Sequence, residues 1–321
     1  MPRKKLAPVH NPFDPASWCT CSQNNLGTET TMYEDVTFLS NGRKLVGHAY
    51  LPETIPAGGG PAVVVVGPAS STKGQVAAVY SRRLAELGYV ALAFDHTSYG
   101  ESEGTPRSDE DPFTKTEDIK NAVTYLAARQ VVDAARIGAV GVCAGGGYAP
   151  YAAVADRRIK AVATVSGLPD LRATIAVGDW PQTMAAAQGA RQAYALDGQA
   201  ITVPFLRPGE LDPWRENGKK FYLTDRNQDP NWKNETLLWS YDKMVQFSAI
   251  DSIELLAPTP LLVIAGTNAE TVGQSHAIYD AAREPKELFL VDGGMHFDFY
   301  DQPRYVGPAV AQIEIFFDKH L

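Results

Sequence analysis

The segment Gly141-Val142-Cys143-Ala144-Gly145 constrains the fold of this chain more than any other part of the sequence. The apolar run at 136–140 is typical of a buried strand, and residues 146–153 predict the start of a helix. A sharp strand-to-helix turn with a glycine two residues to either side of a nucleophile is a nucleophile elbow. The middle residue adopts a strained backbone there, and side chains at the glycine positions would collide. The pattern predicts Cys143 as a nucleophile for acyl transfer, and the helix N-terminus behind it favours the thiolate.

Two alternatives bear on this prediction. Free cysteines are often small buried apolar residues, and Cys143 could fill a tight turn in that way. A second match to the pattern, Gly100-Glu101-Ser102-Glu103-Gly104, carries the commoner serine. The strand before it ends near residue 94, however, and Thr105-Pro106 follows where a helix should begin. We therefore predict that Ser102 belongs to an acidic loop and that Cys143 is the nucleophile.

Strand-like runs alternate with helical patterns along most of the chain. Asn41-Gly42 is a strong signal for a hairpin between the first two runs, and the β-branched run 62–66 is typical of a strand buried on both faces of a parallel sheet. The predicted strands are 33–39, 44–51, 62–66, 89–94, 136–141, 159–165, 261–265 and 287–291. Thr114-Lys115-Thr116-Glu117 is a capping box that predicts a helix start. The alternation predicts an α/β fold with a mostly parallel eight-stranded sheet, helices on both faces, and ligands at the carboxyl ends of the strands.

The alternation is interrupted after the sixth predicted strand. We expect an extended arm at 1–30, a core made of 31–169 and 253–321, and a helical lid at 170–252 that covers the carboxyl edge of the sheet. Aromatic residues gather in the lid. One interpretation is that they form its own core, and the other is that some line an apolar pocket facing Cys143. The predicted substrate-binding residues are Trp180, Trp214, Trp239 and Tyr241.

A thiol of ordinary pKa is only slightly ionised at pH 7 and needs a base. His296 lies in a glycine-containing loop beyond the last predicted strand, where it can reach the elbow. In the chain order nucleophile, acid, histidine, Glu270 is the predicted acid, with Asp292 as the fallback. The oxyanion needs two backbone N–H groups. We assign them to Ala144, which follows the nucleophile, and to Ala69, because the preceding Pro68 has no N–H.

Composition excludes several classes of function. A net charge of −8 and a pI near 5.3 argue against nucleic acid or an anionic membrane as a partner. The three cysteines include Cys19 and Cys21, which are too close in sequence to bridge without strain. With no secretory leader pattern, no long apolar run and no metal-ligand motif, we expect a cytoplasmic protein with reduced thiols and no metal or other cofactor. The sequence leaves the oligomeric state open.

These residues together resemble an α/β-hydrolase of the dienelactone-hydrolase-like group, and within it the fungal polyketide transferases and thiohydrolases with their bacterial relatives. The resemblance covers residues 33–321 and rests on Phe94-Asp95-His96, the acidic loop 100–104, the elbow 141–148, and the loops of Glu270 and His296. It implies a Cys-Asp/Glu-His triad that acts on esters, lactones or thioesters without a cofactor. The chain departs from the group at Gly67-Pro68, Thr97-Ser98 and Pro150.

The resulting hypothesis is a hydrolase of activated acyl groups, namely thioesters, lactones or esters, on a small-molecule or carrier-bound substrate. An acyltransferase would share the first half-reaction and pass the acyl group to an alcohol or amine. A third interpretation is a binding protein or cyclase that kept the pocket and lost hydrolysis. The sequence does not separate these, since water exclusion depends on how the lid closes.

Overall fold

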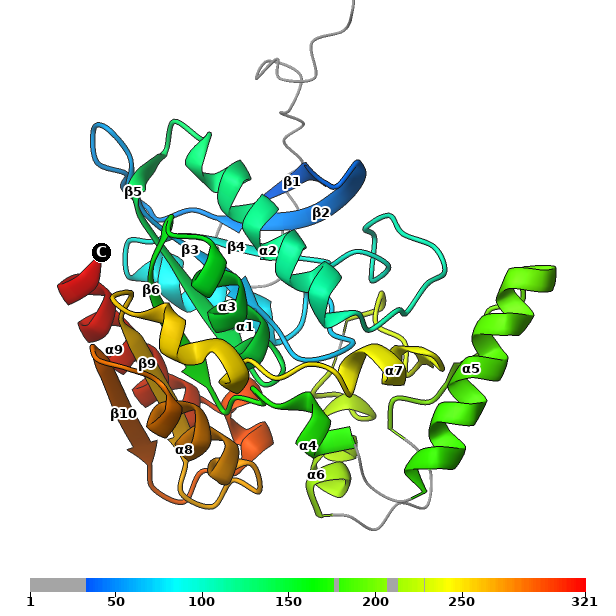
Figure 1. Ribbon diagram of the computed structural model, residues 1–321. Coiled ribbons are helices and arrows are strands. Elements are labelled where there is room, and N and C mark those ends of the chain that lie inside the picture. Colours follow the sequence, from blue (N-terminus) through cyan, green and yellow to red (C-terminus); the bar gives the residue numbers. More distant parts are fainter. Residues whose placement is uncertain (1–32, 176–178, 207–212, 228) are drawn as a thin grey trace, which may run out of the picture.

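The computed structural model describes residues 33–175, 179–206, 213–227 and 229–321 (Figure 1). The predicted arm at 1–30, with Cys19 and Cys21, lies outside the described residues.

One eight-stranded sheet forms the centre of the fold, and its strand order is β1-β2-β4-β3-β5-β6-β9-β10. β1 and β2 pair antiparallel, as do β2 and β4, and every other neighbouring pair is parallel. The central strands are apolar and almost fully buried, as expected for strands covered on both faces. The prediction of a mostly parallel eight-stranded sheet is confirmed. The strands are β1 (Tyr33–Ser40), β2 (Arg43–Tyr50), β3 (Gly60–Val66), β4 (Val90–Phe94), β5 (Val132–Val142), β6 (Ile159–Val165), β9 (Leu261–Gly266) and β10 (Lys286–Val291).

Helices cover both faces of the sheet (Figure 1). α2 packs on α3, and α1 packs on α9. The helices of the core are α1 (Val76–Glu86), α2 (Pro112–Ala127), α3 (Gly145–Ala155), α8 (Val272–Ala281) and α9 (Pro303–His320). α2 begins earlier than its predicted capping box, because the Asp111 carboxylate accepts hydrogen bonds from the N–H groups of Phe113 and Thr114 and Pro112 occupies the first turn.

An insertion lies between β6 and β9, where the sequence predicts the lid. Within its described residues are α4 (Leu171–Ile175), α5 (Trp180–Asp197), β7 (Thr202–Val203), α6 (Pro213–Tyr222), β8 (Thr236–Leu237) and α7 (Ser240–Met244), followed by the 3-10 helix η2 (Ile250–Leu256). In Figure 1, α5 projects away from the sheet, and α4, α6 and α7 lie between it and the core. A small second core of Ala187, Ala190, Leu237 and Trp239 joins α5 to the β8–α7 segment.

The register of the parallel strands gathers their following loops at one edge. Val66 at the end of β3 pairs with Gly141 of β5, which pairs in turn with Thr164 of β6. Val165, the last residue of β6, pairs with Ile264 of β9. The loops after β3, β5, β6 and β9 therefore start side by side, which is where this fold class places its ligands. No helix among the described residues is both long and apolar enough to cross a bilayer.

Candidate active site

The turn between β5 and α3 has the geometry of a nucleophile elbow. Cys143 has φ of 56°, a value that non-glycine residues rarely adopt. A Cβ at Gly141 would lie 2.0 Å from the carbonyl oxygen of Gly145, and one at Gly145 would lie 2.3 Å from the carbonyl oxygen of Val66. Both glycines are therefore required by close backbone approach, as the sequence pattern predicted.

The Cys143 side chain is buried among hydrogen-bond donors. The N–H groups of Ala144 and Ala69 and the hydroxyl of Tyr300 face its sulfur, and each of them lowers the pKa of the thiol. Burial outweighs them and, with a smaller contribution from the negative charge of Glu110, raises that pKa to about 11. The expectation of a thiolate is therefore wrong for this resting state. The helix N-terminus and two N–H groups do not compensate for removing the sulfur from water.

His296 starts the short 3-10 helix η3 (His296–Tyr300), just beyond β10. Its Nε2 lies 3.2 Å from the hydroxyl oxygen of Tyr300, which also faces the Cys143 sulfur. Its Nδ1 lies 2.7 Å from the Thr271 hydroxyl and 3.2 Å from the Ser166 hydroxyl. Burial lowers the pKa of His296 to about 3, so the imidazole is neutral at physiological pH. In the resting state the Cys143 thiol and the His296 imidazole are therefore both neutral, and Tyr300 contacts both.

The predicted acids lie elsewhere. Glu270 accepts a hydrogen bond from the Asn217 side chain at 2.7 Å, and Asp292 accepts one from Thr267 at 3.4 Å. Among the described residues, neither carboxylate is within hydrogen-bonding distance of His296. The loop after β9 instead turns Thr271, the residue next to Glu270, toward Nδ1. In this structure two hydroxyls occupy the position expected for an acid.

Sequence reasoning missed Thr271, Ser166 and Tyr300. A hydroxyl beside the triad histidine has no motif of its own, and Ser166 simply follows β6. Tyr300 did carry a signal, because it lies four residues after His296 and spacings of three to four residues bring side chains to one helical face.

The two predicted oxyanion donors converge on one point. Ala69 belongs to a tight turn in which the Ser71 N–H donates to the Pro68 carbonyl oxygen at 3.3 Å. Because the N–H groups of Ala69 and Ala144 both face the Cys143 sulfur, they lie on the side where an acyl group attached to that sulfur would carry its oxygen.

A cavity of about 500 Å³ opens over Cys143. It has a mixed lining: apolar side chains from the insertion together with a few charged groups. Two of the four predicted substrate-binding aromatics, Trp214 and Tyr241, line it. Trp239 instead packs in the second core, and Trp180 starts α5 without lining the cavity. The lining comprises Ala69, Glu110, Cys143, Leu168, Leu171, Thr174, Ile175, Asp179, Gln182, Thr183, Phe205, Trp214, Arg215, Thr236, Tyr241 and Met244.

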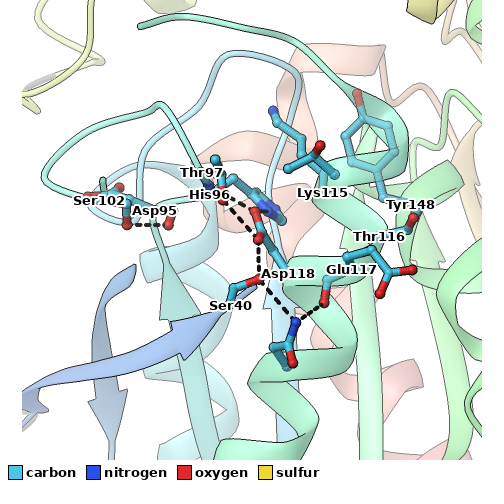
Figure 2. A network of polar contacts seen from close by, with 12 residues as sticks. Ser40, Asp95, His96, Thr97, Ser102, Lys115, Thr116, Glu117, Asp118 and Tyr148 are labelled. Carbon is cyan, nitrogen blue, oxygen red and sulfur yellow. Dashed lines mark hydrogen bonds and ion pairs between the residues drawn. The ribbon is translucent and has the colours of Figure 1, made fainter. Parts of the chain in front are cut away.

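Ser102, the serine of the second glycine pattern, is a structural residue. Its hydroxyl donates to the Asp95 carbonyl oxygen at 2.5 Å (Figure 2). It also accepts from the Val46 N–H at 2.9 Å. These bonds fasten the acidic loop to β2 and β4. No group of His, Cys, Asp and Glu side chains in the described part of the chain has a metal-binding arrangement.

An eight-stranded sheet with a cysteine on the elbow and a buried histidine beyond the last strand defines an α/β-hydrolase. The sequence model of the dienelactone hydrolase family matches residues 47–191. The uncharacterized protein YcjY of Escherichia coli K12 is 33% identical over 81% of this chain and 89% of its own length. Thiohydrolase aneE of Aspergillus aculeatus is 30% identical over 89% of this chain and 93% of its own.

A solved structure is similar as well. The crystal structure of hypothetical protein PA2218 from Pseudomonas aeruginosa has a TM-score of 0.84 at 30% identity, with 94% of this chain and all of that one covered. The chain belongs to the dienelactone hydrolase family. It is an α/β-hydrolase enzyme that acts on ester or thioester bonds.

Proposed function

We propose that this enzyme is a cofactor-independent hydrolase of activated acyl substrates, which are thioesters, lactones or esters, and that it forms an acyl-cysteine at Cys143. The observation that carries the proposal is the convergence of the Ala69 and Ala144 N–H groups on the elbow sulfur inside the cavity. Attack, proton transfer and oxyanion binding need one nucleophile, one base and two donors. The chain supplies all of these itself.

In the first half-reaction the Cys143 sulfur attacks the acyl carbon, and the carbonyl electrons move to an oxygen that the two N–H groups bind. The thiol proton passes to His296 Nε2, and the Tyr300 hydroxyl lies where it can carry it. The resulting imidazolium protonates the leaving group as the tetrahedral intermediate collapses. Because both resting groups are neutral, the proton moves during attack and not beforehand.

In the second half-reaction a water molecule attacks the acyl-cysteine. His296 takes its proton, the oxyanion forms again on the same donors, and the thiol leaves with that proton. A hydroxyl accepting from Nδ1–H stabilises an imidazolium less than a carboxylate does. The base is consequently modest, which favours substrates whose leaving groups depart easily, such as thiolates and phenolates.

Transfer of the acyl group to an acceptor other than water is a second candidate function. One relative carries the name Thiohydrolase aneE, and another, the Acyltransferase drtE of Aspergillus calidoustus, is 27% identical over 80% of this chain. Transfer to an alcohol or amine would follow the same first half-reaction, with the acceptor replacing water in the cavity.

Turnover of an activated acyl thioester by the purified enzyme tests the proposal. Cys143→Ala should abolish it while the Tm stays near that of the wild type, and His296→Ala should cost about 10²–10⁴-fold in kcat, as loss of a general base does. Turnover that persists in Cys143→Ala would rule out the acyl-cysteine route. Adding alcohols or amines during turnover and identifying the products by mass separates transfer from hydrolysis.

A further inference from the structure

Glu110 is a buried carboxylate beside the nucleophile that the chemistry above does not use. It lies in the loop between β4 and α2, is 1% exposed, and lines the cavity together with Cys143. One carboxylate oxygen accepts from the Ser70 N–H at 2.7 Å, and the other accepts from the Tyr148 hydroxyl at 2.7 Å. The Lys115 ammonium, equally buried, lies 2.6 Å away. Burying an ion pair is costly, so a pair retained at the cavity wall calls for a reason other than stability.

The Ser70 contact provides that reason. Ser70 follows the oxyanion donor Ala69 and has φ of 56°, a strained value for serine that costs of order 1–3 kcal/mol. A strained residue persists only where its surroundings fix it. If the peptide between Ala69 and Ser70 flipped, the Ala69 carbonyl oxygen would replace the Ser70 N–H in front of the carboxylate. Glu110 would repel that oxygen and thereby disfavours the flip. The Ala69 N–H belongs to the preceding peptide, which shares the Ala69 Cα with this one, so fixing the Ala69–Ser70 peptide restrains the backbone that sets the direction of the Ala69 N–H.

We propose that Glu110 is a positioning residue for the oxyanion hole: its carboxylate holds the Ala69–Ser70 turn in the orientation that directs the Ala69 N–H at the acyl oxygen. The inference rests on the proposed function, since it assigns a task within that reaction. Tyr148 belongs to α3, the helix behind the elbow, so the same carboxylate ties both halves of the oxyanion hole to one point.

Glu110 also links the hole to the insertion. Its backbone N–H donates to the Ser240 hydroxyl at 2.8 Å, and Ser240 is the first residue of α7. Lys243 of the same helix pairs with Asp109 and Asp111, the two neighbours of Glu110. α7 also contributes Tyr241 and Met244 to the cavity wall. A substrate that shifts α7 would therefore act directly on the loop that carries Glu110.

The charge of Glu110 gives this role an unusual signature. Lys115 and the two hydrogen bonds keep the pKa of Glu110 low despite its burial, so the carboxylate is ionised. That charge raises the pKa of Cys143. Removing the carboxylate should thus weaken acyl transfer, which needs the oxyanion hole, while it eases alkylation of the sulfur, which needs only the thiolate.

The test compares both reactions in the double variant Glu110→Met with Lys115→Met, which removes the carboxylate without stranding the ammonium. The readouts are single-turnover acylation of Cys143 by an activated thioester, alkylation by iodoacetamide across pH 7–10, and Tm. Acylation should fall at least about tenfold, since loss of an oxyanion donor costs ~10²–10³ in kcat. Alkylation should keep or exceed its wild-type rate, with its pH profile moved to lower pH.

Asp118→Asn is the matched control. Asp118 is as buried as Glu110, lies on α2 three residues beyond Lys115, and accepts from the Ser40 hydroxyl and the Thr97 N–H (Figure 2). It does not line the cavity. This variant should lose Tm and leave both reactions at wild-type rates, which shows what a purely structural loss looks like. If the double variant does not fold, Glu110→Gln takes its place. It should lose less of the acylation rate, because the amide oxygen can still accept from the Ser70 N–H, and it should still move the alkylation profile to lower pH, because the negative charge that raises the pKa of Cys143 is gone.

Acylation and alkylation that fall together, or acylation at the wild-type rate in a folded variant, would overturn the role of Glu110. Failure of the proposed function itself gives a different result, because the wild type would then form no acyl-cysteine at all.

Discussion

At the scale of single residues, the main result is a thiol and an imidazole that are both neutral at rest. With a pKa of about 11, only a minute fraction of Cys143 is thiolate at pH 6.5. We predict that iodoacetamide labels Cys143 more slowly than a cysteine in an unfolded peptide at that pH, and that the rate rises about tenfold per pH unit up to pH 10. Peptide mapping after timed labelling measures this. Labelling faster than the peptide at pH 6.5 would indicate a preformed thiolate–imidazolium pair.

Thr271 and Glu270 are adjacent residues that offer a matched comparison at the same scale. Thr271→Ala removes the nearer hydroxyl from His296 Nδ1, and a net hydrogen bond of 0.5–1.5 kcal/mol corresponds to roughly a two- to twelvefold loss in kcat. Glu270→Gln should stay close to wild type, because its carboxylate contacts Asn217. Measuring kcat of both variants with one thioester substrate shows which of the two residues supports His296. If Glu270→Gln is the more damaging change, the carboxylate must reach the histidine during turnover.

At the scale of elements, the insertion divides its aromatics between two tasks. Trp214 lines the cavity, whereas Trp239 packs in the second core. Over a series of acyl thioesters, each added methylene should improve kcat/KM by up to ~0.8 kcal/mol, about fourfold, until the cavity is full. Trp214→Ala should change the chain length at which the gain stops, and Trp239→Ala should lower Tm and leave that length unchanged. A flat profile with acetyl as the best acyl group would contradict an acyl-selecting role.

The same elements show what a sequence can and cannot predict. Strands such as β3 were predictable because a continuous β-branched run rarely adopts another structure than a strand. The elbow was predictable because the close backbone contacts at Gly141 and Gly145 leave no room for a side chain. The start of α2 was missed because two capping signals compete within seven residues, and Asp111-Pro112 prevails over Thr114. Which aromatic faces the cavity, and whether Glu270 or Thr271 faces His296, depends on loop directions that follow no period.

At the scale of the whole molecule, the fold brings together groups from six separate segments. The loops after β3, β4, β5, β6, β9 and β10 supply Ala69, Glu110, Cys143, Ser166, Thr271 and His296, and the insertion encloses them. Because Cys143 and His296 are buried there, both the thiol and the imidazole are kept neutral. In the proposed mechanism, proton transfer therefore starts only when the substrate is attacked.

Trapping the acyl-enzyme is the sharpest test of the proposed acyl-cysteine mechanism. The wild type is mixed with an activated acyl thioester, quenched in acid within one turnover, and analysed by intact mass and peptide mapping. We predict one added acyl group on Cys143 in the wild type and none in Cys143→Ala. An acyl group on another residue, or turnover without any adduct in either protein, would contradict the acyl-cysteine mechanism.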